Sequence, residues 1–303
     1  MQDILIVVLG PTGVGKTDMS VNIAGHFGSE IISCDSRQFF SEMKIGTAVP
    51  SEEQLKKIKH HFIRSLSVKD YYSASLFERD VLNLLPGLFS RNPVVIMAGG
   101  SGMYIDAVLC GIDDIPDIDP LIREKYIRKY KEEGVESLRI SLKMLDPEHY
   151  AKVDLKNYKR IIRALEICEM TGRPYSSFLK KEKRKRSFRS IKIGLMLPRE
   201  ELYERINLRV DRMINQGFEE EARSLFELSY LNALNTVGYK EFFEFFRNKI
   251  SREKAVGLIK RNSRRFAKRQ MTWWAKDKDI RWFHPEREKE IIDYITNSVN
   301  EIN

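Results

Sequence analysis

Cysteine is scarce in this sequence, and the three that occur exclude two kinds of small-protein scaffold. Cys34, Cys110 and Cys168 lie far apart, and none of them forms a C-x-x-C pair. This set excludes a disulfide framework and a thiolate zinc site, and it is typical of a reduced compartment. The five histidines also lack the spacing of metal ligands, because an adjacent pair such as His60 and His61 rarely binds one metal through both rings. We expect the histidines to be ordinary surface or core residues.

Long apolar runs are absent as well, and acidic residues are outnumbered. No apolar stretch approaches the roughly 18 residues that cross a bilayer. The chain begins with Asp3 close to its first residue and runs directly into a motif, which does not resemble a signal peptide. Lys and Arg number 52 against 43 Asp and Glu, a net charge of +9. This excess favours an anionic partner, either nucleic acid or a phosphate-rich ligand. We expect a cytoplasmic, monomeric protein without membrane contact.

The first hundred residues have the pattern of an α/β fold. The chain has 303 residues, enough for one large domain or two ordinary ones. Residues 4–9 form an unbroken apolar run, which predicts a strand buried on both faces of a parallel sheet. Shorter apolar runs follow at 30–34 and 94–97, with helical segments between them. This alternation predicts a parallel sheet flanked by helices.

The pattern changes near Asp113, where Asp and Pro cluster over 113–120. Helical periodicity follows, with Ile122, Tyr126, Ile127 and Tyr130 expected on one face, and glycines at 134 and 172 mark two helix ends. After a basic run at 180–189, a strand-like pattern resumes at 191–197. We therefore predict an α/β core of residues 1–112 and 187–303, interrupted by an all-helical insertion at 113–186. A further helix carries an apolar stripe beside a basic one, formed by Arg205, Arg209 and Arg212.

The clearest motif lies between the first predicted strand and the first predicted helix. It fits G-x-x-x-x-G-K-T, whose glycines let several backbone N–H groups face one centre at the positive end of the helix. The lysine then contacts a phosphate and the threonine hydroxyl can hold Mg²⁺. The alternative is a chance glycine-rich turn, but the flanking strand and helix favour a phosphate loop. Its residues are Gly10, Pro11, Thr12, Gly13, Val14, Gly15, Lys16 and Thr17.

An ordinary ATPase would also have an acidic residue at a strand end to complete its metal site. The predicted strand that ends at Met97 is followed by residues 98–102, none of which is acidic. Asp35, after the second predicted strand, is the nearest candidate. It could be a metal ligand, a general base, or simply a turn or helix-capping residue, and spacing alone does not decide among them.

Residues 258–274 combine six basic residues with Phe266, Trp273 and Trp274. A helix of this composition could follow the phosphates of a nucleic acid while its aromatic rings stack on bases. The alternative is a charged, solvated face over aromatic residues that pack in the core. Composition leaves both interpretations open.

Seven motifs in one order resemble those of the bacterial tRNA dimethylallyltransferases, also called tRNA isopentenyl transferases. The motifs are GPTGVGKT at 10–17, SCDSRQ at 33–38, AGGSGMY at 98–104, KRIIRALE at 159–166, RVDRMINQGF at 209–218, TVGYKE at 236–241 and AKRQMTWW at 267–274. The resemblance covers nearly the whole chain. It implies a phosphate-loop NTPase-like core whose helical insertion contacts tRNA.

The resemblance also implies an activity. Members of this family transfer the dimethylallyl group of dimethylallyl diphosphate to the N6 amine of the adenosine 3′ of the anticodon in tRNA, releasing diphosphate. A phosphate loop that holds a diphosphate leaving group needs no ATP hydrolysis, so the missing acidic residue is consistent with this activity. Three alternatives remain: prenyl transfer to free adenine nucleotides, as in cytokinin formation, a small-molecule kinase, and an RNA-binding protein without catalysis. The basic and aromatic segment at 258–274 argues against the first of these.

Matching the motifs residue by residue implies specific roles. Asp35 resembles the general base, Gly10 to Thr17 with Arg209 the diphosphate clamp, and Thr17 the Mg²⁺ ligand, with Lys16 among the catalytic residues. Ser101 stands where the family usually has Thr, and its hydroxyl could donate to the diphosphate or accept from the amine. The residues that resemble tRNA contacts are Asp35, Ser36, Arg37, Gln38, Ser101, Arg123, Lys159, Arg160, Ile161, Ile162, Arg163, Val237, Gly238, Tyr239, Lys240, Lys268 and Arg269.

Overall fold

The computed structural model describes residues 2–113, 115–116, 119–179 and 184–302, and these form two compact units. The first unit comprises Met1–Leu109 and Lys185–Asn303, and the second comprises Cys110–Arg184. These boundaries lie close to the predicted ones at 113 and 186. Parts of the Asp- and Pro-rich stretch and of the basic run at 180–189 lie outside the described residues.

The first unit contains a six-stranded sheet in the order β3-β2-β4-β1-β5-β6, and every strand pair is parallel. This confirms the predicted α/β class. The three strands expected near the N-terminus and the one at 191–197 are all present, whereas β3 and β6 were not anticipated. The strands are β1 (Ile4–Leu9), β2 (Ile31–Ser33), β3 (His60–His61), β4 (Val94–Gly99), β5 (Arg189–Leu195) and β6 (Ile280–Phe283).

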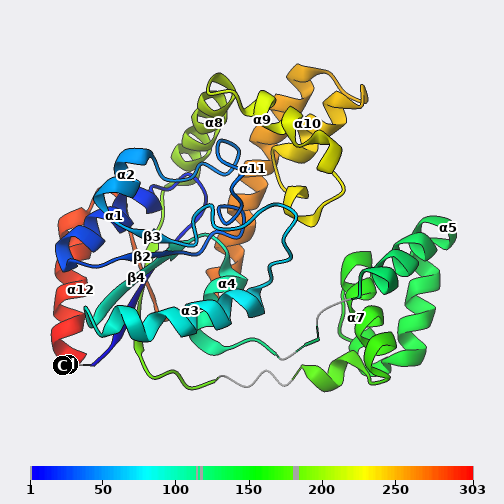
Figure 1. Cartoon of the computed structure of the whole chain (residues 1–303), viewed down its shortest axis with the longest axis horizontal. Coiled ribbons are helices and arrows are strands. Elements are labelled where there is room, and N and C mark those ends of the chain that lie inside the picture. The colour runs from blue at the N-terminus through cyan, green and yellow to red at the C-terminus, as the bar shows by residue number, and fades with distance from the viewer. Residues whose placement is uncertain (1, 114, 117–118, 180–183, 303) are drawn as a thin grey trace. The chain divides into compact units, whose positions relative to one another are not determined.

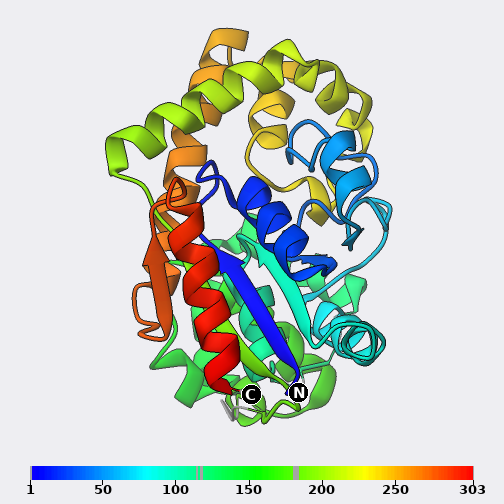
Figure 2. The same cartoon turned by 90° about the vertical axis from the view of Figure 1, so that its left-hand side faces the viewer.

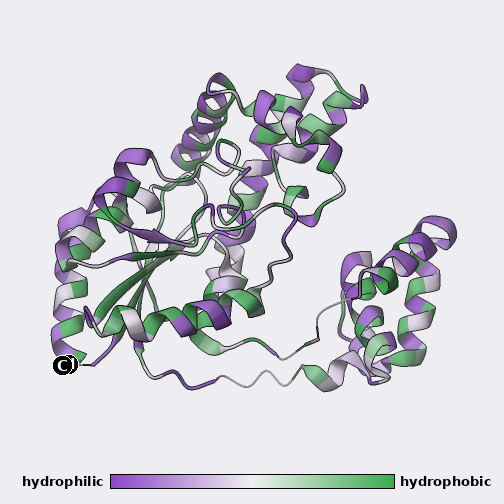
Figure 3. Ribbon diagram, viewed as in Figure 1, coloured by the Kyte–Doolittle hydropathy of each residue, from purple (hydrophilic) through white to green (hydrophobic). Residues whose placement is uncertain are grey.

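Helices cover both faces of this sheet. Since successive residues of β1 point to opposite faces, alternate residues of this strand pack in two different cores. Ile6 belongs to the core shared with α1 (Lys16–Phe27) and α12 (Glu288–Ile302), and Val7 to the core shared with α3 (Ala74–Phe89) and α4 (Gly102–Cys110). Figure 1 labels these elements, and Figure 2 shows α12 in front of the sheet. The central strands β1 and β4 are apolar along their length (Figure 3), as expected for strands buried on both faces. The short helix α2 (Glu52–Lys57) precedes β3.

A third core joins four helices of the first unit and is rich in aromatic residues. Phe242 and Phe243 are buried there, and Phe245 and Phe246 pack against it. Phe218 meets the ring of Tyr239 edge-on at 5.1 Å. The helices are α8 (Arg199–Asn215), α9 (Phe218–Ser224), α10 (Tyr239–Phe246) and α11 (Arg252–Trp274).

The described part of the second unit is helical, with α5 (Pro120–Leu145), α6 (Pro147–Tyr150) and α7 (Tyr158–Thr171). Gly134 interrupts α5 at a φ of 78°, where a helix end was predicted, and Gly172 caps α7 in the left-handed conformation. Tyr126 is buried in the core of this unit and Ile122 and Tyr130 pack against it, but Ile127 is 38% exposed and outside that core, so the prediction that it shares their face was wrong. Across the described residues, no helix is both long enough and apolar enough to span a membrane.

Candidate active site

Sheet topology brings three loops of the first unit together. Strands β2, β4 and β1 are neighbours, and the carboxyl ends of parallel strands meet at one edge. Asp35 follows β2, Gly100 and Ser101 follow β4, and the phosphate loop follows β1. Apart from Arg209, which lies on α8, the residues predicted for catalysis and diphosphate binding therefore lie on adjacent loops, although long stretches of chain separate them.

The phosphate loop has the conformation that its glycines were expected to provide. Gly13 and Gly15 have φ values of 83° and 102°, in the left-handed region that other residues rarely adopt. Lys16 opens α1 and its Nζ donates to the carbonyl of Pro11 at 2.9 Å, so the ammonium lies over the loop. Burial lowers the pKa of Lys16 to about 8, with the Asp35 carboxylate opposing this shift and the Arg209 charge adding to it. The helix N-terminus and the Lys16 ammonium together make a centre of positive charge, which is suited to hold an anion.

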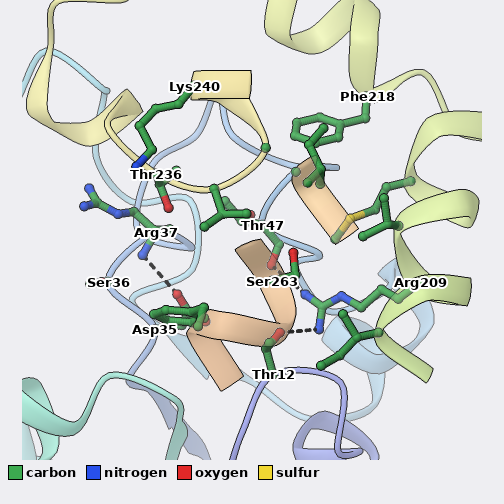
Figure 4. A pocket seen from close by; sticks show the side chains of 18 of the residues that line it. Thr12, Asp35, Ser36, Arg37, Thr47, Arg209, Phe218, Thr236, Lys240 and Ser263 are labelled. Atoms are coloured by element: carbon green, nitrogen blue, oxygen red, sulfur yellow. Dashed lines mark hydrogen bonds between the residues drawn. The ribbon is translucent and has the colours of Figure 1, made fainter. Parts of the chain in front are cut away.

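Arg209 reaches this centre from α8 (Figure 4). Its Nη1 donates to the hydroxyl of Thr12 at 3.2 Å and its Nη2 to the carbonyl of Thr47 at 3.5 Å. Burial lowers the pKa of the guanidinium, and the Asp35 carboxylate opposes that shift. Arg205, on the same basic stripe, instead pairs with Glu201 at 2.9 Å. All three arginines of the predicted stripe line a further cavity beside Lys16 and Thr17, and of the three only Arg209 also lines the cavities that Asp35 lines.

Asp35 and Ser101 lie beside each other through Ser36. The Oδ1 of Asp35 accepts from the backbone N–H of Arg37 at 3.1 Å, which is the turn interaction considered as the alternative to a catalytic role. Ser101 Oγ accepts from the N–H of Ser36 at 3.0 Å and donates to the Ser36 hydroxyl at 3.2 Å. The turn holds the carboxylate in place and does not conflict with its use as a base.

Two cavities share Thr12, Asp35 and Arg209. The smaller one, about 60 Å³, is lined also by Lys16, Thr17 and Gln270. The larger one, about 280 Å³, combines apolar residues of the four-helix core with polar groups, among them Arg37, Thr236, Lys240 and Ser263 (Figure 4). Asp35 therefore faces both the phosphate loop and a separate mixed cavity. This arrangement can hold an anion on one side of a carboxylate and a ring with polar edges on the other.

Most first-unit residues predicted to contact tRNA lie at this site. Ser36, Arg37, Val237, Gly238, Lys240 and Arg269 line the larger cavity, and Gln38 lines the smaller one. Some of the hydrogen-bond donors of these side chains are already bound to backbone carbonyls of the protein. Arg37 Nη1 donates to the carbonyl of Ala233 at 3.0 Å, and Gln38 Nε2 donates to the carbonyl of Thr47 at 3.1 Å. Lys268 is exposed on α11.

Three residues predicted to contact tRNA have buried side chains that cannot reach it. Tyr239 is 0% exposed, and its hydroxyl donates to Glu221 Oε1 at 2.6 Å. Ile161 and Ile162 are buried in the core of the second unit. The motifs that named them span complete helical turns and so include both the inward and the outward face.

The other predicted contacts of the second unit lie on its surface or in ion pairs. Lys159 and Arg160 are exposed at the start of α7. Arg123 forms a bidentate pair with the buried Glu166, at 2.7 and 3.1 Å. Arg163 Nη2 donates to the carbonyl of Pro116 at 3.4 Å. These residues belong to a unit separate from the one that holds Asp35.

The basic segment at 258–274 combines both interpretations that composition left open. Trp274 is buried in a sheet-facing core, whereas Trp273 is 50% exposed and donates from its indole to Asp106 at 2.8 Å. Phe266 is also exposed, beside Arg269. One face of α11 packs inward and the other presents basic and aromatic side chains.

Sequence reasoning missed Gln270, which joins two of the three loops. Its Oε1 accepts from the backbone N–H of Thr12, and its Nε2 donates to the carbonyl of Gly100, both at 2.8 Å. A signal was present, because Gln270 lies three residues after Ala267 and four before Trp274, on the buried face of the helix. A polar residue on that face is expected to have a specific hydrogen-bond partner.

Comparisons with known proteins agree with the motif order. A family model described as IPP transferase matches residues 38–277. The chain is 52% identical to tRNA dimethylallyltransferase 1 of Bacteroides fragilis, covering 97% of this chain and 98% of that protein. It is 56% identical to tRNA dimethylallyltransferase 1 of Porphyromonas gingivalis, over 94% of this chain and 95% of that one.

Solved structures show the same fold. The full-length tRNA isopentenylpyrophosphate transferase of Bacillus halodurans is 32% identical, with a TM-score of 0.72 over 99% of this chain and 98% of that one. A eukaryotic dimethylallyltransferase acting on tRNA has a TM-score of 0.78 at 24% identity, over 97% of this chain and 80% of that one, a likeness of fold. With a family model spanning residues 38–277 and relatives more than half identical along nearly its whole length, the chain belongs to the IPP transferase family.

Proposed function

We propose that this protein transfers the dimethylallyl group of dimethylallyl diphosphate to the N6 amine of the adenosine 3′ of the anticodon in tRNA. The observation that carries the proposal is the position of Thr12, Asp35 and Arg209 at the border of two cavities. One cavity belongs to the phosphate loop and the other has apolar walls with polar groups. Membership of the IPP transferase family supports the same reaction.

In this proposal the phosphate loop binds the diphosphate. Backbone N–H groups at the start of α1, the Lys16 ammonium and the Arg209 guanidinium surround the departing oxygens. They stabilise the negative charge that grows there as the bond between C1 of the dimethylallyl group and oxygen breaks. Arg209 suits this role because a guanidinium can hold two phosphate oxygens at once.

Asp35 then serves as the general base. The N6 amine of adenine becomes strongly acidic as its nitrogen forms the new bond to C1, so a nearby carboxylate is basic enough to accept the proton. The hydrogen bond from the N–H of Arg37 to Oδ1 orients the carboxylate. Ser101 holds the turn that carries Asp35 through its contacts with Ser36.

The smaller cavity offers Mg²⁺ one hydroxyl ligand, that of Thr17. Among the described residues, no group of three or more His, Cys, Asp or Glu side chains could hold a metal ion. A Mg²⁺ ion needs no such group when a single hydroxyl, water and substrate phosphates supply its ligands. When bound, the ion would neutralise charge on the diphosphate, and Thr17 would be its protein ligand.

The tRNA would lie against the exposed basic and aromatic side chains. Phe266, Lys268, Arg269 and Trp273 form one such surface on α11. Lys159 and Arg160 on the second unit add further positive charge. The target adenine must leave its stack to reach Asp35, and an unpaired anticodon loop lowers the cost of that step.

The test is incubation with labelled dimethylallyl diphosphate and either unmodified tRNA or AMP as acceptor. We expect label in tRNA and none in AMP. Labelled AMP would support cytokinin-type transfer instead, and ATP consumed in step with product would support a kinase.

Asp35→Asn should lower turnover about 100-fold or more while tRNA affinity changes less than about threefold. The matched control is Asp293→Asn, at an exposed position on α12, which should leave turnover unchanged. Near wild-type turnover in Asp35→Asn would remove Asp35 from the base role.

A further inference from the structure

Gln270 is a buried polar side chain whose amide is used at both ends. It is 7% exposed, and its two hydrogen bonds go to the phosphate loop and to the loop after β4. We propose that Gln270 is a positioning residue for prenyl transfer, one that sets the separation between the diphosphate cradle and the general base. This inference rests on the function proposed above and assigns a role to a residue that does not itself touch the reacting atoms.

A continuous series of contacts connects Gln270 to both halves of the site. On one side, Thr12 gives its N–H to Gln270 and receives a hydrogen bond from Arg209 at its hydroxyl. On the other side, Gly100 precedes Ser101, which holds Ser36 and thereby the turn of Asp35. Beyond the strand pairing that brings these loops together, one side chain therefore links the clamp for the leaving group to the base.

Gly100 indicates how close this approach is. A methyl group at position 100 would collide with the amide nitrogen of Gln270. Gly100 is not among the glycines with a positive φ. The glycine is therefore needed here because it leaves room for the Gln270 amide, and not because of its backbone conformation. A glycine at 100 and a glutamine at 270 form a matched pair, and the pairing explains the second glycine of the motif at 98–104.

The two partners require an acceptor and a donor on one side chain. The N–H of Thr12 needs an acceptor and the carbonyl of Gly100 needs a donor, which the glutamine amide supplies at the correct length. A glutamate is isosteric, but its ionised form accepts at both oxygens and meets the Gly100 carbonyl without a proton. Its protonated form restores both hydrogen bonds. The charged or titratable groups that line the same cavity are Lys16, Asp35, Arg209 and His60.

The experiment measures the single-turnover rate of prenyl transfer to tRNA, with thermal unfolding recorded for each variant. Gln270→Met removes both hydrogen bonds and should lower the rate about 10- to 100-fold, because misplacing catalytic groups by about 1 Å costs that much. The affinity for tRNA should stay within about threefold. Trp274→Phe, one turn away in the core, controls for general loosening of α11 and should lower the unfolding temperature without lowering the rate.

Gln270→Glu separates positioning from stability. Its rate relative to wild type should rise at least about fivefold as pH falls from 8 to 6, because the protonated carboxyl again donates to the Gly100 carbonyl. A ratio that is constant over this range, or a Gln270→Met enzyme with the wild-type rate, would overturn the proposal. A wild-type enzyme that labels neither tRNA nor AMP would instead overturn the proposed function, so the two failures are distinguishable.

Discussion

Replacement of Arg209 by Ala tests the diphosphate clamp most directly. The guanidinium is partly buried and lies within hydrogen-bond distance of Thr12 and Thr47, and Asp35 is the acidic residue that lines the same two cavities. At an effective dielectric constant of about 20, two unit charges about 4 Å apart interact by about 4 kcal/mol, which is an upper limit for a contact that water screens in part. A charge-assisted hydrogen bond contributes about 1.5–3 kcal/mol.

These values set the expected size of the effect. Since about 1.4 kcal/mol corresponds to a tenfold change, Arg209→Ala should weaken diphosphate binding about 10- to 100-fold. Arg209→Lys keeps the charge but loses the second donor, so it should weaken binding less, about 3- to 10-fold. The affinity for tRNA should change little, because Arg209 projects from α8 toward the phosphate loop (Figure 4).

The assay is direct titration of inorganic diphosphate with Mg²⁺, followed by steady-state kinetics with dimethylallyl diphosphate. The matched control is Arg199→Ala, an arginine at the start of the same helix whose guanidinium lies over the ring of Tyr203, 5.1 Å from its centre. That variant should bind diphosphate like wild type. If Arg209→Ala keeps wild-type diphosphate affinity and a wild-type response to dimethylallyl diphosphate, the leaving group does not lie where we place it.

Three further outcomes follow from the same site. Because the pKa of Lys16 is about 8, kcat/KM for dimethylallyl diphosphate should fall about tenfold per pH unit above that value as the ammonium loses its charge, and a flat profile to high pH would contradict this. Gly99→Ala places a methyl group against the Cys34 carbonyl and should lower the free energy of unfolding by about 3 kcal/mol in urea titrations. Gly87→Ala, with open space around it, should be neutral or stabilising. The logarithm of tRNA affinity should fall linearly with the logarithm of salt concentration, and salt-independent binding would argue for a small-molecule acceptor.

Local patterns predicted those parts of the fold that local sequence determines. The apolar run at Ile4–Leu9 and the glycines of the phosphate loop can be recognised within a window of about 15 residues. The structure has the predicted strand, loop and helix there. The strand β3 was missed because two residues, His60 and His61, show no periodicity. The strand β6 was missed because its four residues include the charged Arg281.

Asp35 shows a second limit of sequence reasoning. Its position after a strand left three roles open, a metal ligand, a general base, or a turn or helix-capping residue, as though they excluded one another. The structure shows the turn hydrogen bond to the N–H of Arg37 and also places Asp35 in the walls of both cavities. A structural role of one carboxylate oxygen restrains the side chain, and that restraint is useful to a base that must stay in one position.

Tyr239 and Gln270 show which features of the site can be known only from the tertiary structure. Both belong to motifs, and a motif says nothing about which of its residues face inward. Tyr239 was placed among the tRNA contacts, yet its partner is Glu221, 18 residues away along the chain. Gln270 was passed over directly after the basic residues Lys268 and Arg269, yet its partners are Thr12 and Gly100, 258 and 170 residues away. Helical spacing could have assigned both to a buried face, but only the packing of α11 against the loops after β1 and β4 identifies what a buried amide holds together. That pairing is a property of the tertiary structure, which is why we expect Gln270→Met to change catalysis more than its place directly after two charged residues would suggest.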